Sequence, residues 1–297
     1  MSLTNPILSR CDSLRDPAIW PVPGGYWIYY TRHSNYRTWF ADENWSIARV
    51  FTKDFHTFEG DADLSPKGFA SPGDIVRWHG RFLLPYQSYP THPSRLCVSE
   101  SLDAIHWSPA RFILPEANTL PWNTRQRAID PTFVVDGDTL HCYFVGGTPT
   151  EGENQFQEAN ANLLGHAWTQ DPELEKWTVV SREEPLFGRS SLAPDGVENV
   201  LVFRPADKWL MIYSEGLKCQ HLALAESDDL FKWERKGIIE IPHQAWLANR
   251  HGAPSVWKEG DIWKMLLMGE DAERRGTIGM LTSPDGLHWT PLPEDAD

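Results

Sequence analysis

The hydrophobic positions of the chain fall in short runs broken by turns, and one arrangement of these runs recurs five times. Each recurrence opens with two apolar runs separated by a polar or glycine-containing turn, which is the pattern of a β-hairpin. The second run of each pair is rich in aromatic and aliphatic side chains. The five openings read RDPAIWPVPGGYWIYYT, SPGDIVRWHGRFLLPYQ, IDPTFVVDGDTLHCYFVG, VENVLVFRPADKWLMIYS and GAPSVWKEGDIWKMLLMG.

Each hairpin is followed by a third apolar run, such as HLALAES or TIGMLTS, and then by a closing segment. The closing segments share a Ser or Thr, an acidic loop and an aromatic residue. We expect these aromatic side chains to pack between neighbouring units rather than to bind a ligand. They are Phe58, Trp107, Trp177, Trp233 and Trp289.

Three clear strands and a fourth, recurring about every 55 to 70 residues, match the blade of a β-propeller. Two packed β-sandwiches would not give five units in phase. The sequence therefore predicts an all-β protein, a single five-bladed β-propeller domain over residues 1–297 with few regular helices. The blades are expected at about 10–60, 68–112, 126–182, 194–240 and 249–293.

Composition and charge agree with this fold and narrow the ligand class. The 297 residues include 15 Trp, 8 Tyr and 13 Phe together with 23 Pro and 21 Gly, which describes strands punctuated by turns. The net charge of −14 is spread along the chain, and a field of that sign disfavours nucleic acid and anionic membranes. The N-terminus MSLTNPILSR lacks the apolar run of a secretory signal, and no segment approaches a membrane span, so a cytoplasmic location is expected.

The four cysteines lie far apart and form no CxxC pair, so their spacing indicates neither a zinc site nor a redox motif. We expect all four, Cys11, Cys97, Cys142 and Cys219, to be buried thiols.

Three segments interrupt the repeat, and added loops on a rigid scaffold often shape a binding site. They are ILPEANTLPWNTRQR, TPTEGENQFQEANAN and PHQAWLANRH.

The openings place acidic residues where the blades meet. The first strand of each propeller blade is the innermost, so the residues that begin these strands converge on the central channel. They include Asp16, Asp130 and Glu198, with Asp74 close to the same phase in the second unit and His251 in the fifth. An Asp-Pro pair also starts turns, so a single acid of this kind indicates little. Carboxyl groups that share a pocket push their pKa values apart, and glycoside hydrolysis needs one ionised and one protonated carboxyl group.

The pattern resembles the five-bladed propeller glycosidases, most closely glycoside hydrolase family 43, over about residues 10 to 292. In that family an Asp opening the first blade is the general base, an Asp opening the third tunes the pKa of the acid and orients the sugar, and a Glu opening the fourth is the general acid. The matching residues are Asp16 in RDPAIW, Asp130 in AIDPTF and Glu198 in GVENVL. The resemblance implies inverting hydrolysis of arabinose- or xylose-containing oligosaccharides, with no required cofactor.

Five further residues are candidates for substrate binding, each with a structural alternative. Arg127 would orient Asp130 or grip the sugar, or is a surface charge. The rings of Trp20 and Trp78 would stack on a sugar, or pack in the core. His251 is similar in place to a family histidine that contacts a water or a calcium ion, so a calcium ion near the channel centre is the one metal the resemblance allows; a buried structural histidine is the alternative. The five candidates are Asp74, Arg127, His251, Trp78 and Trp20.

The chain also departs from the family. Members often follow the acid with Gly-Pro, whereas this chain has Asn199-Val200. The Asn-Asp-Pro-Asn-Gly motif of the related fructosidases is absent, which argues against a retaining fructan hydrolase. Two other classes stay open: a propeller that binds a glycan without cleaving it, and a glycoside phosphorylase or transglycosidase on the same scaffold. A phosphorylase needs a cationic pocket, for which Arg127, Arg204, Arg250, Arg274 and Arg275 are candidates.

Overall fold

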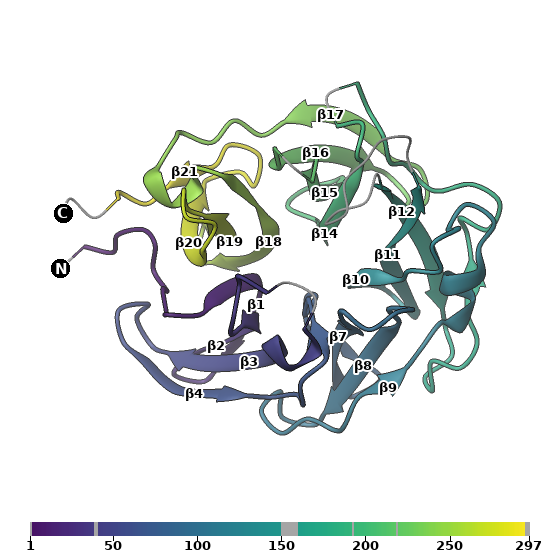
Figure 1. Ribbon diagram of the computed structural model, residues 1–297, viewed down its shortest axis with the longest axis horizontal. Coiled ribbons are helices and arrows are strands. Elements are labelled where there is room, and N and C mark those ends of the chain that lie inside the picture. The colour runs from purple at the N-terminus through teal and green to yellow at the C-terminus, as the bar shows by residue number, and fades with distance from the viewer. Residues whose placement is uncertain (1, 39–40, 150–159, 192, 218, 295–297) are drawn as a thin grey trace.

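Five antiparallel sheets stand around a central axis in the computed structural model (Figure 1). The structure describes residues 2–38, 41–149, 160–191, 193–217 and 219–294. Four sheets have four strands in sequence order, and in the second the inner strand is split into two short pieces that both pair with the next strand. This arrangement confirms the predicted all-β, five-bladed propeller.

The strand bounds are as follows, blade by blade. The first blade holds β1–β4 (Ser13–Val22, Gly25–His33, Trp45–Thr52, Phe58–Asp63), and the second holds β5–β9 (Phe69–Ala70, Val76–Trp78, Arg81–Ser88, Leu96–Ser101, Arg111–Phe112). The third holds β10–β13 (Ile129–Asp136, Thr139–Pro149, Asn160–Thr169, Thr178–Val179), and the fourth holds β14–β17 (Val197–Phe203, Trp209–Glu215, His221–Ser227, Glu234–Ile238). The fifth holds β18–β21 (Arg250–Glu259, Ile262–Glu270, Gly276–Ser283, Thr290–Pro291). The helices within the described ranges are short 3-10 turns, η1 (Asp42–Asn44), η2 (Pro115–Thr119) and η3 (Ala245–Leu247).

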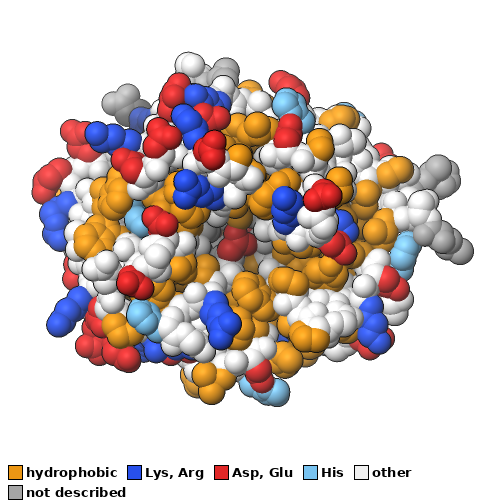
Figure 2. Space-filling view, turned by 180° about the vertical axis from the view of Figure 1, so that it is seen from behind, with side chains coloured by type: hydrophobic (Ala, Val, Ile, Leu, Met, Phe, Trp, Pro, Cys, Tyr) orange, Lys and Arg blue, Asp and Glu red, His pale blue; other side chains and the backbone are white. Residues whose placement is uncertain are grey.

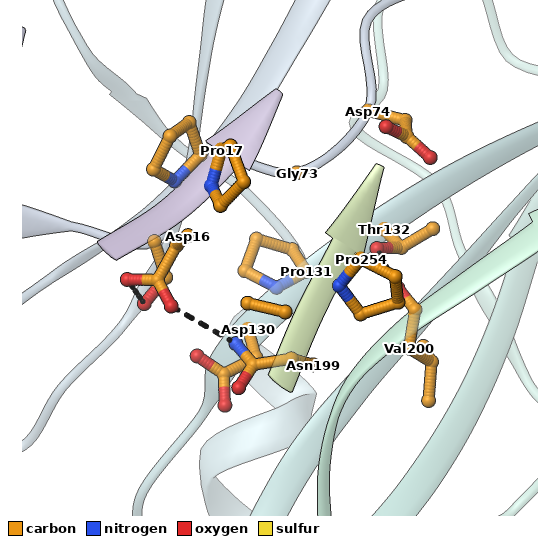
Figure 3. A pocket seen from close by; sticks show the side chains of 13 residues that line it. Asp16, Pro17, Gly73, Asp74, Asp130, Pro131, Thr132, Asn199, Val200 and Pro254 are labelled. Carbon is orange, nitrogen blue, oxygen red and sulfur yellow. Dashed lines mark hydrogen bonds between the residues drawn. The ribbon is translucent and has the colours of Figure 1, made fainter. Parts of the chain in front are cut away.

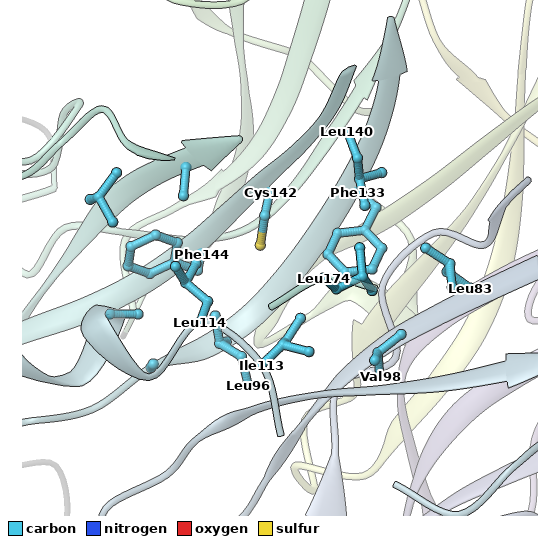
Figure 4. Close-up of a cluster of buried hydrophobic side chains, with 14 of the residues drawn as sticks. Leu83, Leu96, Val98, Ile113, Leu114, Phe133, Leu140, Cys142, Phe144 and Leu174 are labelled. Carbon is cyan, nitrogen blue, oxygen red and sulfur yellow. The ribbon is translucent and has the colours of Figure 1, made fainter. Parts of the chain in front are cut away.

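Hydrophobic clusters fill the five gaps between neighbouring blades. The cluster between the second and third blades, for example, joins Leu83 and Val98 to Phe133 and Phe144 (Figure 4). Burying apolar faces against neighbours is what makes each blade stable, since no single blade can cover its own surface. The aromatic residues of the five closing segments each belong to a different cluster, which confirms their predicted packing role: Phe58, Trp107, Trp177, Trp233 and Trp289.

The acidic loops of the closing segments also have a structural role. In the second blade the Ser101 hydroxyl accepts a hydrogen bond from the Asp103 N–H at 3.2 Å, and Asp103 Oδ1 accepts the N–H groups of Ile105 and His106, both at 2.8 Å. A short acid that accepts two backbone N–H groups holds a tight turn. These acids therefore bring the closing aromatic residue back onto the sheet.

The N-terminal segment closes the ring by joining the last blade, and both chain ends lie on that side of the molecule (Figure 1). The Asn5 side chain, fully buried, donates to the Met280 carbonyl at 3.0 Å and accepts from the Met280 N–H at 2.8 Å. The main chain of Leu8 pairs with Ile278 in both directions at 3.0 Å.

We expect Asn5→Ala to lower the free energy of unfolding by about 1 to 3 kcal/mol, because it leaves the buried N–H of Met280 without its acceptor, while the Met280 carbonyl still accepts the Leu292 N–H at 3.0 Å. Urea unfolding measures this change, and Asn5→Asp, which keeps only the acceptor, is expected to fall between the wild type and the alanine variant. Equal stability of Asn5→Ala and the wild type would show that the contact of Asn5 with the last blade does not stabilise the closed ring of blades.

The cysteine prediction is half wrong. Cys97 and Cys142 are buried, but Cys11 and Cys219 are exposed. Cys11 precedes β1 on the N-terminal segment and Cys219 lies in the loop before β16, so neither belongs to a strand that faces a neighbouring blade. In the described parts of the chain no helix is long and apolar enough to cross a membrane.

Candidate active site

Each inner strand bends at one residue that faces the channel. In the blades that pair regularly, the register shifts at this point, as in a β-bulge, which turns the strand locally and re-aims a side chain. The bent residues have left-handed backbone conformations, which cost about 1 to 3 kcal/mol each for residues other than glycine and cluster at functional sites. These five bent residues form a ring around the channel, and we call them the ring residues. They are Asp16 (φ 49°), Ser71 (51°), Asp130 (48°), Asn199 (48°) and Ala253 (52°).

The bend corrects the predicted phase in three blades, and in the fifth the bent residue is Ala253 instead of His251. In the second blade the ring position belongs to Ser71, and Asp74 lies further along the chain. In the fourth blade it belongs to Asn199, and Glu198 precedes it. The sequence signal for Ser71 was the following proline, which four of the five ring residues share: Asp16-Pro17, Ser71-Pro72, Asp130-Pro131 and Ala253-Pro254.

Asp16 is held by three hydrogen-bond donors. Its Oδ2 accepts from the Thr31 hydroxyl at 2.8 Å and from the Ser71 hydroxyl at 3.2 Å, and its Oδ1 lies 3.4 Å from Asn199 Nδ2 (Figure 3). The Thr31 oxygen in turn accepts the Ser71 N–H at 2.7 Å, which fixes the hydroxyl proton on the side of Asp16. The carboxylate is thus oriented by residues of three blades.

Burial dominates the pKa values of the two ring acids. The pKa of Asp16 is raised above 3.8 mainly by desolvation, which the Thr31 hydrogen bond and the charge of Arg15 oppose. The pKa of Asp130 is raised well above 3.8, first by desolvation and then by the charges of Glu198 and Asp16. Burial and the like charges of its neighbours thus both favour the neutral form of Asp130.

Glu198 lies beside the ring with both carboxyl oxygens hydrogen-bonded. Asn162 donates to Oε2 at 3.0 Å and Gln220 donates to Oε1 at 2.8 Å. The structure therefore brings together Asp16, Asp130 and Glu198, as the sequence predicted for the three blades. It adds four residues that the sequence did not single out as site residues: Thr31, Ser71, Asn162 and Gln220.

A collar of prolines separates Asp74 from the ring acids. Figure 3 shows Pro17, Pro131 and Pro254 between Asp74 on one side and Asp16 and Asp130 on the other. The cavity in this part of the channel has a volume of about 20 Å³ for the centres of water molecules. That is room for about one water.

Asp74 lines this same small cavity together with Asp16 and Asp130, so only a water-sized group reaches it from the side of the two acids. It accepts a hydrogen bond from the Ser255 hydroxyl at 2.8 Å, and burial raises its pKa to about 7.

The face of the molecule seen in Figure 2 is hollowed at its centre, and an acidic side chain is visible inside the hollow.

Three arginines lie near the acids, and the charges of two of them, Arg15 and Arg250, are paired with Glu270. Arg15 donates to Glu270 Oε2 at 2.7 Å, and Arg250 Nε donates to the same oxygen at 3.1 Å. Arg127 is close enough to lower the pKa of Asp130 through its charge, although burial outweighs this effect. The Asn123 side chain fixes the Arg127 main chain through both its N–H and its carbonyl.

The two candidate tryptophans lie in the packing between blades. Trp78 is 3% exposed and belongs to the cluster between the second and third blades. Trp20 packs edge-on against Phe82, with ring centroids 5.3 Å apart, in the cluster between the first and second. Both therefore take the structural alternative, and we leave them out of the substrate site.

His251 lies close to His221 of the fourth blade rather than in the collar. Burial, followed by the charge of His221, lowers its pKa to about 4, and its Nε2 is buried without a hydrogen-bond partner. Calcium prefers six to eight oxygen ligands. Among the residues that the structure describes, no three His, Cys, Asp or Glu side chains form a group that could hold a metal. The described side chains around His251 do not fit a calcium ion, and we assign it no step.

The interrupting segment TPTEGENQFQEANAN mostly lies outside the described residues, which omit 150–159.

Comparisons with known proteins find the same fold at low sequence identity. Neither a protein-family model nor a curated protein matches the sequence. A thermostable family-43 glycoside hydrolase superposes with a TM-score of 0.73 at 14% identity, over 100% of this chain and 98% of that one. An α-L-arabinofuranosidase from Lactobacillus brevis gives 0.68 at 13% identity, over 99% and 98%.

A β-xylosidase/α-arabinofuranosidase of the same family from a compost microbial metagenome, solved with xylotriose, gives 0.67 at 14% identity, over 100% and 99%. The chain thus has the five-bladed fold of these glycosidases from end to end.

Proposed function

We propose that the protein is an inverting glycoside hydrolase that acts on oligosaccharides containing arabinose or xylose. The observation that carries this proposal is the convergence of Asp16, Asp130 and Glu198 from three blades, where Asp130 is buried, Asp16 is half-buried and the charge of Glu198 raises the pKa of both. The likeness to family-43 xylosidases and arabinofuranosidases supports the reaction class and the sugars.

In this mechanism Glu198 gives its proton to the glycosidic oxygen as the bond from that oxygen to C1 breaks. Asp16 takes a proton from a water whose oxygen bonds to C1 from the opposite face, so the product has the inverted anomeric configuration. Such a water fits when the two carboxyl groups are roughly 6.5 to 9.5 Å apart. Asp130 binds a sugar hydroxyl, and because its ionised form and that of Glu198 repel each other, the pair keeps a proton that Glu198 can donate.

Two alternatives are disfavoured by the same residues. A binding protein without activity would not need three mutually repelling acids, because buried carboxyl groups of this kind cost stability. A phosphorylase pocket would present unpaired arginines beside a single acid, whereas Arg15 and Arg250 both pair with Glu270 next to three acids.

The test is a panel of aryl arabinosides and xylosides, with the first-formed sugar anomer followed by proton NMR. Hydrolysis with inversion is expected. Retention would remove Asp16 from the role of base. Product formation only when phosphate is supplied would identify a phosphorylase, and sugar binding without turnover would identify a binding protein.

The pH dependence of kcat/KM should report Asp16. The base must be ionised, and its pKa is raised in the folded protein, so activity should fall as the pH drops through a value above 3.8. Rates are measured from pH 4 to 8 while circular dichroism checks that the chain stays folded. A rate that is constant down to pH 4 would contradict the assignment of Asp16.

A further inference from the structure

Glu198 is held by side-chain amides from two different blades. Asn162 comes from β12 of the third blade, and Gln220 directly precedes β16 of the fourth. Their amide nitrogens lie 3.0 and 2.8 Å from the two carboxyl oxygens, and the residues are only 1% and 3% exposed. Each oxygen of the acid therefore has a buried N–H donor of its own.

The oxygen atoms of both side-chain amides show that each amide is oriented by its hydrogen bond to Glu198. Asn162 Oδ1 and Gln220 Oε1 are buried and have no hydrogen-bond partner. A buried acceptor without a partner lowers the stability of the folded chain. Turning either amide around would aim its oxygen at a carboxyl oxygen and lose the bond to Glu198. The fold thus tolerates two unpaired acceptors and keeps two donors on the acid.

The fifth blade keeps Gln220 in place. A Cβ at Gly252 would lie 2.5 Å from Gln220 Oε1 and 2.5 Å from the Ser214 hydroxyl oxygen, so only glycine leaves room for the amide. The Gln220 carbonyl also accepts the His251 N–H at 3.3 Å. Three blades therefore determine how Glu198 is oriented.

We propose that Asn162 and Gln220 are positioning residues that stabilise the negative charge developing on Glu198 as it releases its proton, and that Gly252 keeps Gln220 aligned. The inference rests on the proposed function. When the O–H bond of the acid breaks, the proton goes to the leaving oxygen and the electron pair stays on the carboxyl group. Donors already aimed at that charge stabilise the transition state without reorganising.

The kinetic test uses leaving groups of different basicity, because a poor leaving group needs the proton and a good one does not. For Gln220→Met, which keeps the side-chain length but has no donor, we expect kcat/KM to fall about 10- to 100-fold with alkyl glycosides or disaccharides. With dinitrophenyl glycosides we expect a fall of less than about threefold. Cys219→Ser, at the exposed neighbour, is the matched control and should match the wild type. Equal losses with all leaving groups would overturn the proposal.

A second variant tests the role of the fifth blade. Gly252→Ala should displace the Gln220 amide without touching Glu198, and should show the same dependence on the leaving group. In the Gly252→Ala, Gln220→Met double variant the losses should not multiply, because both changes remove one interaction. Multiplying losses would show that Gly252 acts independently of Gln220.

A measurement without substrate separates this inference from the proposed function. The side-chain amide signals of Asn162 and Gln220 are followed by NMR of nitrogen-15-labelled protein and assigned with Asn162→Leu and Gln220→Met. Glu198→Leu, which removes both acceptors, should shift both signals and speed the exchange of these amide protons with solvent. Changed signals in a chain that hydrolyses no glycoside would support the amide contacts and refute the hydrolase. An active enzyme whose amide signals do not change in Glu198→Leu would refute the role of the amides.

Discussion

Asp16→Asn is expected to lower kcat about 10²- to 10⁴-fold while the chain stays folded. An amide cannot take the proton from the attacking water. The fold should survive because Asn tolerates a left-handed backbone and its carbonyl can still accept from Thr31 and Ser71. Single-turnover and steady-state rates on aryl xylosides and arabinosides measure the loss, and circular dichroism checks the fold.

The matched control for this experiment is Asp74→Asn, the same substitution beyond the proline collar. It should leave turnover within about twofold of the wild type, because no substrate group reaches that side of the collar. Unchanged turnover in Asp16→Asn would remove this residue from the mechanism. An equal loss in Asp74→Asn would show that the substrate enters from the other end of the channel.

The architecture could be predicted because the same local rules are repeated in every blade. Each hairpin must bury one face against its neighbour, so apolar runs, turn residues and a closing aromatic recur in phase. Trp107 and Trp289, more than a hundred residues apart, occupy equivalent places in different clusters. Repetition of this kind is read from the sequence without knowing any contact between blades.

The site was predicted only in part, because its finer geometry depends on where each inner strand bends. In the second blade, for example, Ser71 and Asp74 both lie near the start of the inner strand, and only the position of the bend decides that Ser71 faces Asp16. Asn162 and Gln220 had no local signal at all. Asn162 reaches Glu198 from β12 through the packing of the third blade against the fourth, and Gln220 reaches it from the loop before β16 within the fourth blade.

The departure at Asn199 has a physical explanation. Its φ of 48° is a conformation that glycine adopts freely and that Asn tolerates better than most other residues. Asn at this place therefore keeps the bend that follows the acid, and adds a side-chain amide 3.4 Å from Asp16 Oδ1. Asn199 thus fits the bend at this position and places one more donor beside the proposed base.

Asp74 should make the protein less stable as the pH rises. Burial raises its pKa from 3.8 to about 7, so the folded state holds a proton that the unfolded chain releases between these values. The folded state binds more protons in this window, and its free energy of unfolding therefore falls as the pH rises, by about 4 kcal/mol in total.

Asp74→Asn removes this dependence and keeps an acceptor for Ser255. The free energy of unfolding of the variant minus that of the wild type should increase by about 2 to 3 kcal/mol between pH 5 and pH 8, measured by urea unfolding. Ser255→Ala should move the loss of stability to higher pH, because the Ser255 hydroxyl lowers the pKa of Asp74 by favouring the ionised form. A constant difference between Asp74→Asn and the wild type would mean that water reaches this carboxylate and that the proline collar does not keep it dry.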